Sequence, residues 1–250
     1  MHWRQSLAGI VIALTAFCAL FGAGAEETPL TVVFFGDSIT GPRPGEAYQQ
    51  NYVKFADLVG LMLEARTGGP VRVVNSGWAG DRSYADPGKG VPGAQTRVER
   101  DVVAHHPDVA VVLIGGYDQA DRRDNSRRAM TAIFSRLKEA GIPTLVLTYH
   151  AARADNPDGY KGFQHITANN ELIEELAKAN GHPVLAMEAP MAAAVQGQGR
   201  KALLNDHDGV HLKPAGELVY ARAIFARLMD LGWVRDTTQA RSGAATKGKK

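Results

Sequence analysis

The strongest constraint on the fold is a regular alternation of short apolar runs with longer amphipathic segments. Five runs are rich in Val, Leu and Ile and are mostly continuous, which is typical of strands buried on both faces of a parallel sheet. These runs are residues 30–35, 71–75, 109–114, 144–149 and 184–187. In the segments between and after them, apolar residues recur at three- and four-residue spacing, which predicts helices. The predicted helices are residues 48–66, 96–104, 125–140, 166–180 and 214–231.

Because strand and helix patterns alternate along the chain, right-handed crossovers onto a single sheet are expected. The predicted fold class is therefore α/β, with about five parallel strands between two layers of helices. A chain of 250 residues, 45% hydrophobic and 22% charged, is typical of one globular domain. We place this domain at residues 26–235, with no linker inside it.

The N-terminal segment, residues 1–25, is predicted to be a secretory signal peptide. Arg4 precedes an almost wholly apolar stretch, residues 7–21, and small residues follow before Glu26. The alternative is an uncleaved membrane anchor, for which about 15 apolar residues are few. We therefore expect export, to the periplasm or out of the cell. Cleavage would remove Cys18, the only cysteine, and with it any disulfide or thiolate metal site.

The remaining composition excludes several classes of partner. The formal net charge is +2, and the basic residues are scattered among acids, which argues against a nucleic-acid-binding protein. Residues 236–250 lack large apolar side chains and end in Lys-Gly-Lys-Lys, which indicates a disordered basic tail. Residues 88–93 match Gly-x-Gly-x-x-Gly, but no strand directly precedes them and Pro92 interrupts the expected helix start. We therefore do not assign a dinucleotide site there.

A candidate nucleophile follows the first apolar run, in the polar turn Gly36-Asp37-Ser38. A serine just after a buried parallel strand lies where open α/β sheets bind their ligands. Ser38 is therefore the residue around which a catalytic site would be arranged. The alternative is ordinary turn chemistry, in which Asp37 and Ser38 only cap a following helix.

A second polar cluster, residues 206–211, precedes the last predicted helix and reads Asp-His-Asp-Gly-Val-His. Asp208 and His211 are three residues apart, so one turn can place a carboxylate beside an imidazole. An acyl-transfer serine needs such a pair, with His211 to take the Ser38 proton and Asp208 to orient the ring. Two alternatives stay open: a metal site built from the same cluster, and a polar loop that caps the last helix.

The two motifs, in this order and spacing, resemble those of the GDSL or SGNH hydrolases, over about residues 30–232. The resemblance implies a flavodoxin-like sheet and a serine esterase or acylhydrolase that needs no metal or organic cofactor. It implies that Ser38, Asp208 and His211 are catalytic. The block after the second predicted strand, residues 75–83, then implies that Gly80 and Ser38 donate backbone N–H groups to the oxyanion; Gly77 is the alternative glycine.

The third block departs from the family pattern. Gly-x-Asn-Asp corresponds to residues 115–118, so Tyr117 stands where the family has an asparagine in the oxyanion hole. Losing one such donor typically lowers turnover by about 10² to 10³. Three outcomes are open: Tyr117 is a displaced donor, another group such as Gln119 substitutes, or the chain is weak or inactive. The last outcome would leave a carbohydrate- or lipid-binding protein.

The resemblance also suggests a range of ester substrates, from short-chain esters and acetylated polysaccharides to lysophospholipids. An exported chain without a long apolar lid segment favours small acyl groups, including acetyl esters of carbohydrates. Trp78 and Tyr149 fall near strand ends and are candidates to line the substrate pocket. A metal-dependent phosphoesterase would need a second acidic cluster, which the sequence lacks.

Overall fold

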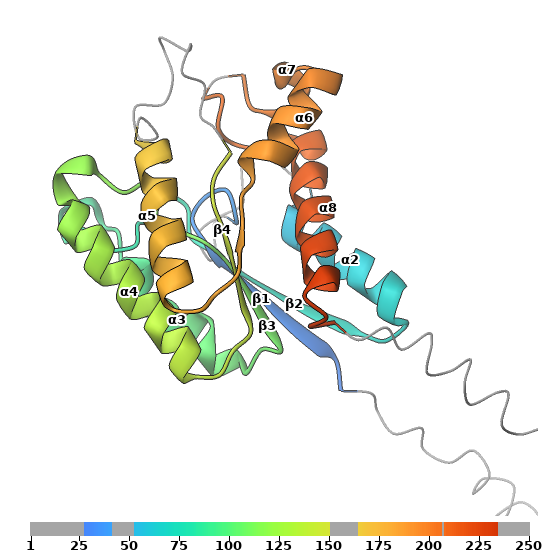
Figure 1. Ribbon diagram of the computed structural model, residues 1–250, viewed down its shortest axis with the longest axis horizontal. Helices are drawn as coiled ribbons and strands as arrows, with labels where there is room; N and C mark the ends of the chain where they lie inside the picture. The colour runs from blue at the N-terminus through green and yellow to red at the C-terminus, as the bar shows by residue number, and fades with distance from the viewer. Residues whose placement is uncertain (1–27, 42–52, 151–164, 207, 235–250) are drawn as a thin grey trace, which may run out of the picture.

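The computed structural model describes residues 28–41, 53–150, 165–206 and 208–234. One sheet lies between two layers of helices (Figure 1). Its strands are β1 (Leu30–Gly36), β2 (Val71–Gly77), β3 (Val109–Leu113), β4 (Thr144–Leu147) and β5 (Val184–Leu185). Their order is β2-β1-β3-β4-β5, and all neighbouring pairs are parallel. This is the flavodoxin-like order, so the predicted fold class is confirmed.

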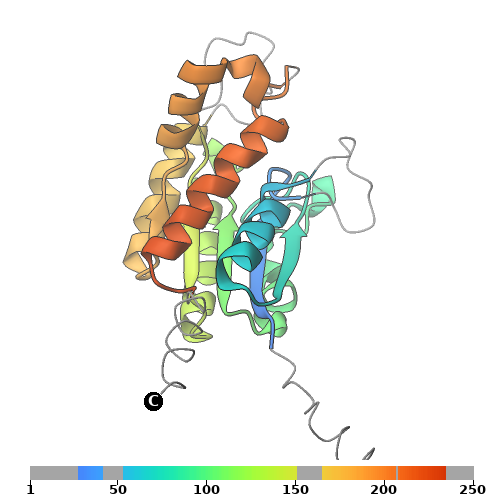
Figure 2. The same cartoon turned by 90° about the vertical axis from the view of Figure 1, so that its right-hand side faces the viewer.

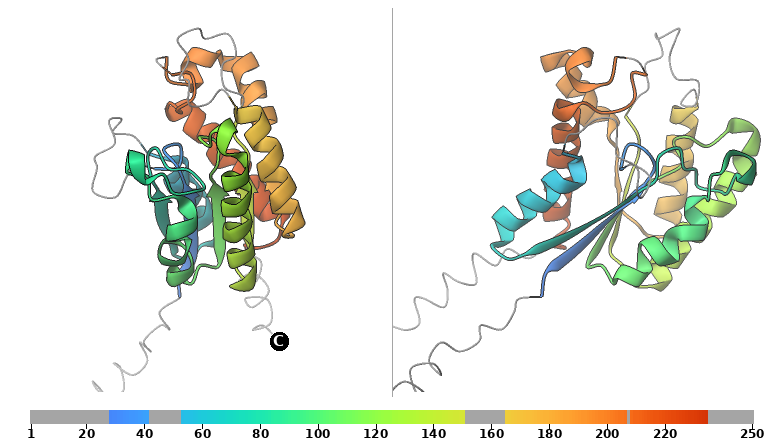
Figure 3. Two further views of the ribbon diagram at one scale, coloured as in Figure 1. Left: turned by 90° about the vertical axis from the view of Figure 1, so that its left-hand side faces the viewer. Right: turned by 180° about the vertical axis from the view of Figure 1, so that it is seen from behind.

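Helices cover both faces of the sheet. On one face, α2 (Phe55–Thr67) packs beside α8 (Pro214–Asp230) (Figure 2). The other face carries α3 (Ala94–Asp101), α4 (Arg123–Glu139) and α5 (Ile166–Ala179) (Figure 3). Three short 3₁₀ turns complete the connections: η1 (Pro87–Lys89), η2 (Val103–His105) and η3 (Ala120–Arg122). The layers therefore agree with the predicted alternation.

Two helix predictions need correction. The first helix was expected from residue 48, but Lys54 is extended and caps a helix that begins at Phe55; residues 42–52 lie outside the described part. The sequence pattern also missed α6 (Glu188–Gln198) and α7 (Arg200–Leu203), which lie beside the N-terminal half of α8 (Figure 1). Met191 is the only buried residue of α6, so the helix has almost no apolar periodicity to recognise.

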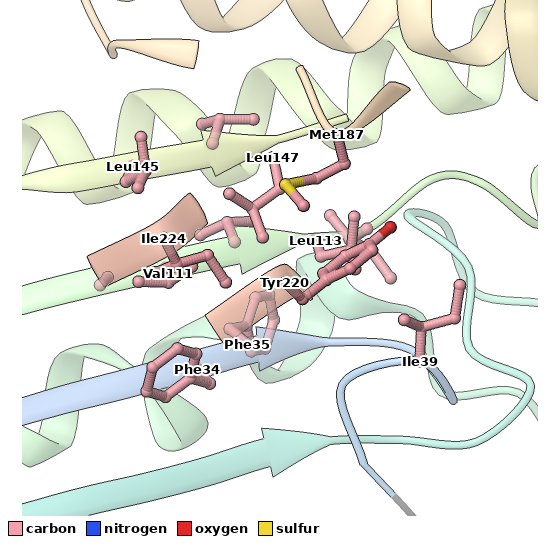
Figure 4. Close-up of a cluster of buried hydrophobic side chains, with 14 of the residues drawn as sticks. Phe34, Phe35, Ile39, Val111, Leu113, Leu145, Leu147, Met187, Tyr220 and Ile224 are labelled. Atoms are coloured by element: carbon pink, nitrogen blue, oxygen red, sulfur yellow. The ribbon is translucent and has the colours of Figure 1, made fainter. Parts of the chain in front are cut away.

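The core explains why the strands read as continuous apolar runs. Residues 32–35 of β1 are all fully buried, because helices cover both faces. Phe34 faces the α2–α8 layer, with its ring 5.8 Å from that of Phe55, and Tyr220 packs 5.5 Å beyond Phe55. Figure 4 shows Phe34, Phe35 and Tyr220 among the buried hydrophobic side chains of the core. Burying one such phenylalanine contributes about 1.5–3 kcal/mol.

The strand order reverses between β1 and β3, where ligands of such sheets bind. Both chain ends, residues 1–25 and 236–250, lie outside the described residues, so the signal peptide and the basic tail stay predictions. Among the helices that are described, none combines the length and the apolar character needed to cross a membrane.

Candidate active site

The turn after β1 presents Ser38. Oδ1 of Asp37 accepts the backbone N–H of Ile39 at 3.0 Å, which folds the turn back on itself. Gly36 allows this geometry because a Cβ there would lie 2.4 Å from the carbonyl oxygen of Leu113 in β3. The chain can therefore turn sharply against the neighbouring strand and leave Ser38 partly exposed.

Ser38, His211 and Asp208 form a continuous hydrogen-bonded chain. Oγ of Ser38 lies 2.8 Å from Nε2 of His211, and Nδ1 of His211 lies 2.8 Å from Oδ2 of Asp208. Oδ1 of Asp208 accepts the backbone N–H groups of Val210 at 2.8 Å and of His211 at 2.9 Å. Burial alone would raise the pKa of Asp208, but these hydrogen bonds hold it below its usual value. An ionised Asp208 fixes the ring with Nδ1 protonated and Nε2 able to accept a proton.

Backbone hydrogen bonds hold the loop that carries His211. The carbonyl oxygen of His211 accepts the N–H of Asn205 at 2.8 Å, and Gly209, at φ 66°, donates to the carbonyl of Asn205. Lys213 donates its N–H to the carbonyl of Leu203 at 2.8 Å, just before α8 begins. The unpredicted helix α7 therefore supports the loop.

The carboxylates of this loop do not point at a common centre. Asp208 binds the His211 ring, whereas Oδ2 of the exposed Asp206 lies 2.8 Å from Nζ of Lys213. The part of the chain that the structure describes contains no group of three His, Cys, Asp or Glu placed to hold a metal ion. His207 lies outside that part.

The glycine block follows β2. Gly80 has φ 78° and closes a turn in which Asp81 donates its N–H to the carbonyl of Trp78 at 3.0 Å. The rival glycine, Gly77, has a different role, because a Cβ there would lie 2.2 Å from the backbone nitrogen of Gly41. Gly77 therefore lets the two loops pack together, and Gly80 is the glycine at the exposed turn.

Arg97 of α3 joins the ends of β1 and β2, and sequence reasoning missed it. It is 2% exposed, and its guanidinium donates to the carbonyls of Gly36 at 2.7 Å and Ser76 at 2.8 Å. Nε donates to Oδ2 of the buried Asp81 at 2.7 Å, and the guanidinium lies 4.2 Å from the ring centroid of Phe35. Arg97 thus ties the strand that leads to Ser38 to the block that contains Gly80.

Tyr117 contacts Arg82, which lies in the loop after β2. The guanidinium of Arg82 lies 4.9 Å from the ring centroid of Tyr117, and Nε of Arg82 donates to the Tyr117 carbonyl at 3.2 Å. The next residue, Asp118, accepts the N–H of Ser83 at 3.0 Å and also its hydroxyl. Burial raises the pKa of Asp118 to about 6, although these hydrogen bonds act to lower it. The second and third blocks are therefore joined by buried polar contacts.

The two predicted pocket residues, Trp78 and Tyr149, differ in their exposure to solvent. Trp78 is partly exposed beside the Gly80 turn, so a substrate contact stays a prediction. Tyr149 is fully buried, and its hydroxyl donates to Oδ2 of Asp37 at 2.6 Å. We correct its assignment from the pocket to the support of the Ser38 turn, because a ring with no exposed surface cannot line a pocket.

A second histidine, His150, is buried near the loop that carries His211. Nδ1 of His150 is 2.7 Å from the hydroxyl of Tyr220 in α8. Burial lowers the pKa of His150 to about 4, and the nearby charge of His211 acts in the same direction. His150 is therefore neutral near pH 7.

Comparison with known proteins identifies the family. The profile of the GDSL-like lipase/acylhydrolase family matches residues 34–219. The chain belongs to this family. It is accordingly an ester-hydrolysing enzyme. Among curated proteins, no sequence matches.

Solved structures with the same fold come from several sources. An acetylxylan esterase from Geobacillus stearothermophilus is 21% identical with a TM-score of 0.61, covering 84% of this chain and 98% of its own. A lipase/acylhydrolase from Enterococcus faecalis is 22% identical with a TM-score of 0.61, covering 82% and 97%. An α/β hydrolase from the metagenome of Lake Arreo, Spain, is 20% identical with a TM-score of 0.62, covering 82% and 96%.

Proposed function

We propose that this chain is an exported serine esterase that uses Ser38, His211 and Asp208 as its catalytic triad. The observation that carries the proposal is the pair of 2.8 Å contacts from Ser38 through His211 to Asp208. Structures of the Geobacillus acetylxylan esterase include catalytic mutants of a serine, an aspartate and a histidine, with the last two three positions apart. Asp208 and His211 have the same spacing.

In the proposed reaction, His211 accepts the hydroxyl proton of Ser38 as Oγ attacks the ester carbonyl carbon. The developing oxyanion is held by the backbone N–H groups of Ser38 and Gly80. The bond to the alcohol oxygen then breaks, and His211 gives its proton to the leaving alcohol. Water attacks the acyl-enzyme after passing a proton to His211, which returns it to Ser38 as the carboxylic acid leaves.

Small acyl groups are the substrates we propose, in particular acetyl esters of carbohydrates. The support is the predicted export of a chain without a long apolar lid segment, and the activity named for the acetylxylan esterase. Lysophospholipid, which carries a long acyl chain, is the alternative substrate. The two are distinguished by comparing kcat/KM for p-nitrophenyl esters of increasing acyl length. A fall of kcat/KM from acetyl to octanoyl supports the proposal, and a rise contradicts it.

The alternative to test is that Tyr117, in place of the family's asparagine, leaves this family member without turnover, as a carbohydrate- or lipid-binding protein. Hydrolysis of p-nitrophenyl acetate, p-nitrophenyl butyrate and acetylated xylooligosaccharide by the wild type, Ser38→Ala and Tyr117→Asn separates the two. The esterase proposal expects activity in the wild type that Ser38→Ala abolishes. An inert wild type whose Tyr117→Asn variant hydrolyses these esters would instead support the binding protein. Lower activity in Tyr117→Asn than in the wild type would identify the tyrosine as a working donor.

Export is tested on the full chain produced in a bacterial host. Mass spectrometry of the periplasmic or medium fraction should find a protein that begins at Glu26. A cytoplasmic or membrane-bound product that retains residues 1–25 would contradict export without affecting the triad.

A further inference from the structure

Asp37 is a buried carboxylate beside the nucleophile that the proposed reaction does not use. It is 1% exposed, and its two oxygens have different partners. Oδ1 accepts the N–H of Ile39, on the far side of Ser38, and Oδ2 accepts the hydroxyl of Tyr149 at 2.6 Å. A hydroxyl that donates to a carboxylate at this distance makes one of the stronger hydrogen bonds in proteins. The turn that carries Ser38 is therefore tied to Tyr149.

Tyr149 lies two residues beyond the end of β4, a strand that β3 separates from β1. Its ring reaches Asp37 only because residue 116 is glycine: a Cβ at Gly116 would lie 2.5 Å from Cζ of the ring. The side chain of Asn170 in α5 holds the Tyr149 backbone at both groups, accepting its N–H at 2.9 Å and donating to its carbonyl at 2.8 Å. The hydroxyl is thus held in place by the segment after β3 and by α5.

The charges around Asp37 link it to the acid–base residue. Burial raises the pKa of Asp37 to about 6, while the Tyr149 hydroxyl, the Ile39 amide and the charge of His211 oppose this rise. Asp81 also acts on Asp37, but its own charge is paired with Arg97. The titratable groups that face Asp37 are Tyr149 from the segment after β4, His211 from the loop before α8, Asp81 from the loop after β2 and Tyr220 from α8. Because electrostatic coupling is mutual, an ionised Asp37 stabilises a protonated His211.

We propose that Tyr149 and Asp37 form a positioning pair for the nucleophile. Tyr149 holds the Asp37 carboxylate ionised and in place, and that carboxylate fixes the Ser38 turn and favours the imidazolium form of His211. The inference rests on the proposed function, since His211 must become protonated each time Ser38 attacks. It assigns part of the acid limb of the pH profile to Asp37.

The direct test is the pH profile of kcat/KM in Tyr149→Phe, which removes only the hydroxyl. A lost hydrogen bond to a charged group raises the pKa of Asp37, so the acid limb should move upward by about one pH unit. Tyr84→Phe is the matched control: Tyr84 is 3% exposed, and its hydroxyl accepts the N–H of Gln119 at 3.3 Å, away from Asp37. An unmoved acid limb in Tyr149→Phe, or the same shift in Tyr84→Phe, would overturn the inference.

NMR titration of the Asp37 carboxyl in the resting protein separates this inference from the proposed function. The pKa of Asp37, which burial raises to about 6, should rise further in Tyr149→Phe, because that variant loses a hydrogen bond to the charged form. An unchanged Asp37 titration in Tyr149→Phe would refute the inference even if the enzyme is active. Equal hydrolysis by the wild type and Ser38→Ala would refute the proposed function and leave the titration result standing.

Discussion

The turn that carries Ser38 and the loop that carries His211 meet at one edge of the sheet, yet different interactions hold them. Around the nucleophile the ties are buried side chains, chiefly Arg97 with Asp81, at 2% and 0% side-chain exposure. Around His211 and Asp208 the loop is held by backbone hydrogen bonds, and these two side chains are 19% and 14% exposed.

The difference matters because the two sides have different tasks. Groups that bind an oxyanion must be oriented before the charge develops, and buried ion pairs with several hydrogen bonds give that rigidity at the cost of desolvation. In the proposed reaction, His211 has to exchange protons with substrate and water, so partial exposure suits it. We therefore expect changes near the nucleophile to affect folding and changes near His211 to affect turnover.

The largest effect is expected on the His211 side. Asp208→Asn removes the charge that orients the ring and stabilises its protonated form, so kcat should fall by about 10³-fold or more. Asp206→Asn, two residues earlier, changes only an exposed carboxylate on Lys213 and should keep kcat within a few-fold. Steady-state hydrolysis of p-nitrophenyl acetate measures both. Equal losses of kcat in the two variants would show that turnover depends on the integrity of the loop rather than on the charge of Asp208.

Arg97→Met tests the nucleophile side. It leaves Asp81 buried without its cation, which should lower the free energy of unfolding by about 3–5 kcal/mol. Arg100→Met, on the same helix, removes a cation with 68% side-chain exposure and should cost less than about 1 kcal/mol. Urea denaturation followed by circular dichroism gives both values. A small loss of unfolding free energy in Arg97→Met would mean that the buried Arg97–Asp81 pair does not stabilise the region around Ser38.

The buried His150 gives a pH-dependent effect of intermediate size. Its pKa is lowered to about 4 in the folded chain against 6.5 for an unperturbed imidazole, so its contribution to stability is complete above pH 6.5. As the pH falls from 6.5 to 4, the unfolded chain binds a proton that the folded chain does not, and about 3 kcal/mol is lost.

The measurement is the free energy of unfolding of the wild type minus that of His150→Gln, taken at pH 7, 5.5 and 4. The difference should decrease steadily toward pH 4. A difference that stays constant with pH would show that His150 becomes protonated without resistance and is not confined as described.

Asn75→Ala should have the smallest effect. Its side-chain amide donates to the carbonyl of Thr40 at 2.9 Å and accepts the N–H of Gly77 at 3.0 Å, joining the first two loops from an exposed position. Loss of these contacts should lower stability by about 1 kcal/mol and kcat by only a few-fold. A fall in kcat as large as that of Asp208→Asn would contradict the division between the two sides.

The same contrast explains what could be predicted from the sequence. Asp208 and His211 stand on one turn, so their proximity follows from spacing alone, and the buried strand before Ser38 indicates where its turn must lie. The central strands β1, β3 and β4 were recognisable because burial on both faces removes polar residues from them. The edge strands β2 and β5 are only partly buried but still carry short runs of Val and Leu. These features depend on neighbours in the chain or on one periodic pattern.

The features that were missed depend on residues far apart in the sequence. Arg97 looks like an ordinary basic residue of a short helix, and only the fold brings it to the carbonyl of Gly36, 61 positions away. Tyr149 stands at a strand end, where a pocket residue is expected, but the absence of a side chain at Gly116 lets it turn inward. α6 buries so little of its surface that periodicity could not reveal it.

The most direct test of the central claim, catalysis through Ser38, is mass spectrometry of the full chain quenched in acid during turnover of p-nitrophenyl acetate. We expect a single acetyl group on the peptide that contains Ser38, and none in Ser38→Ala or in His211→Ala. Undiminished hydrolysis by Ser38→Ala, or an acyl group on another residue that turns over as fast as product forms, would contradict it.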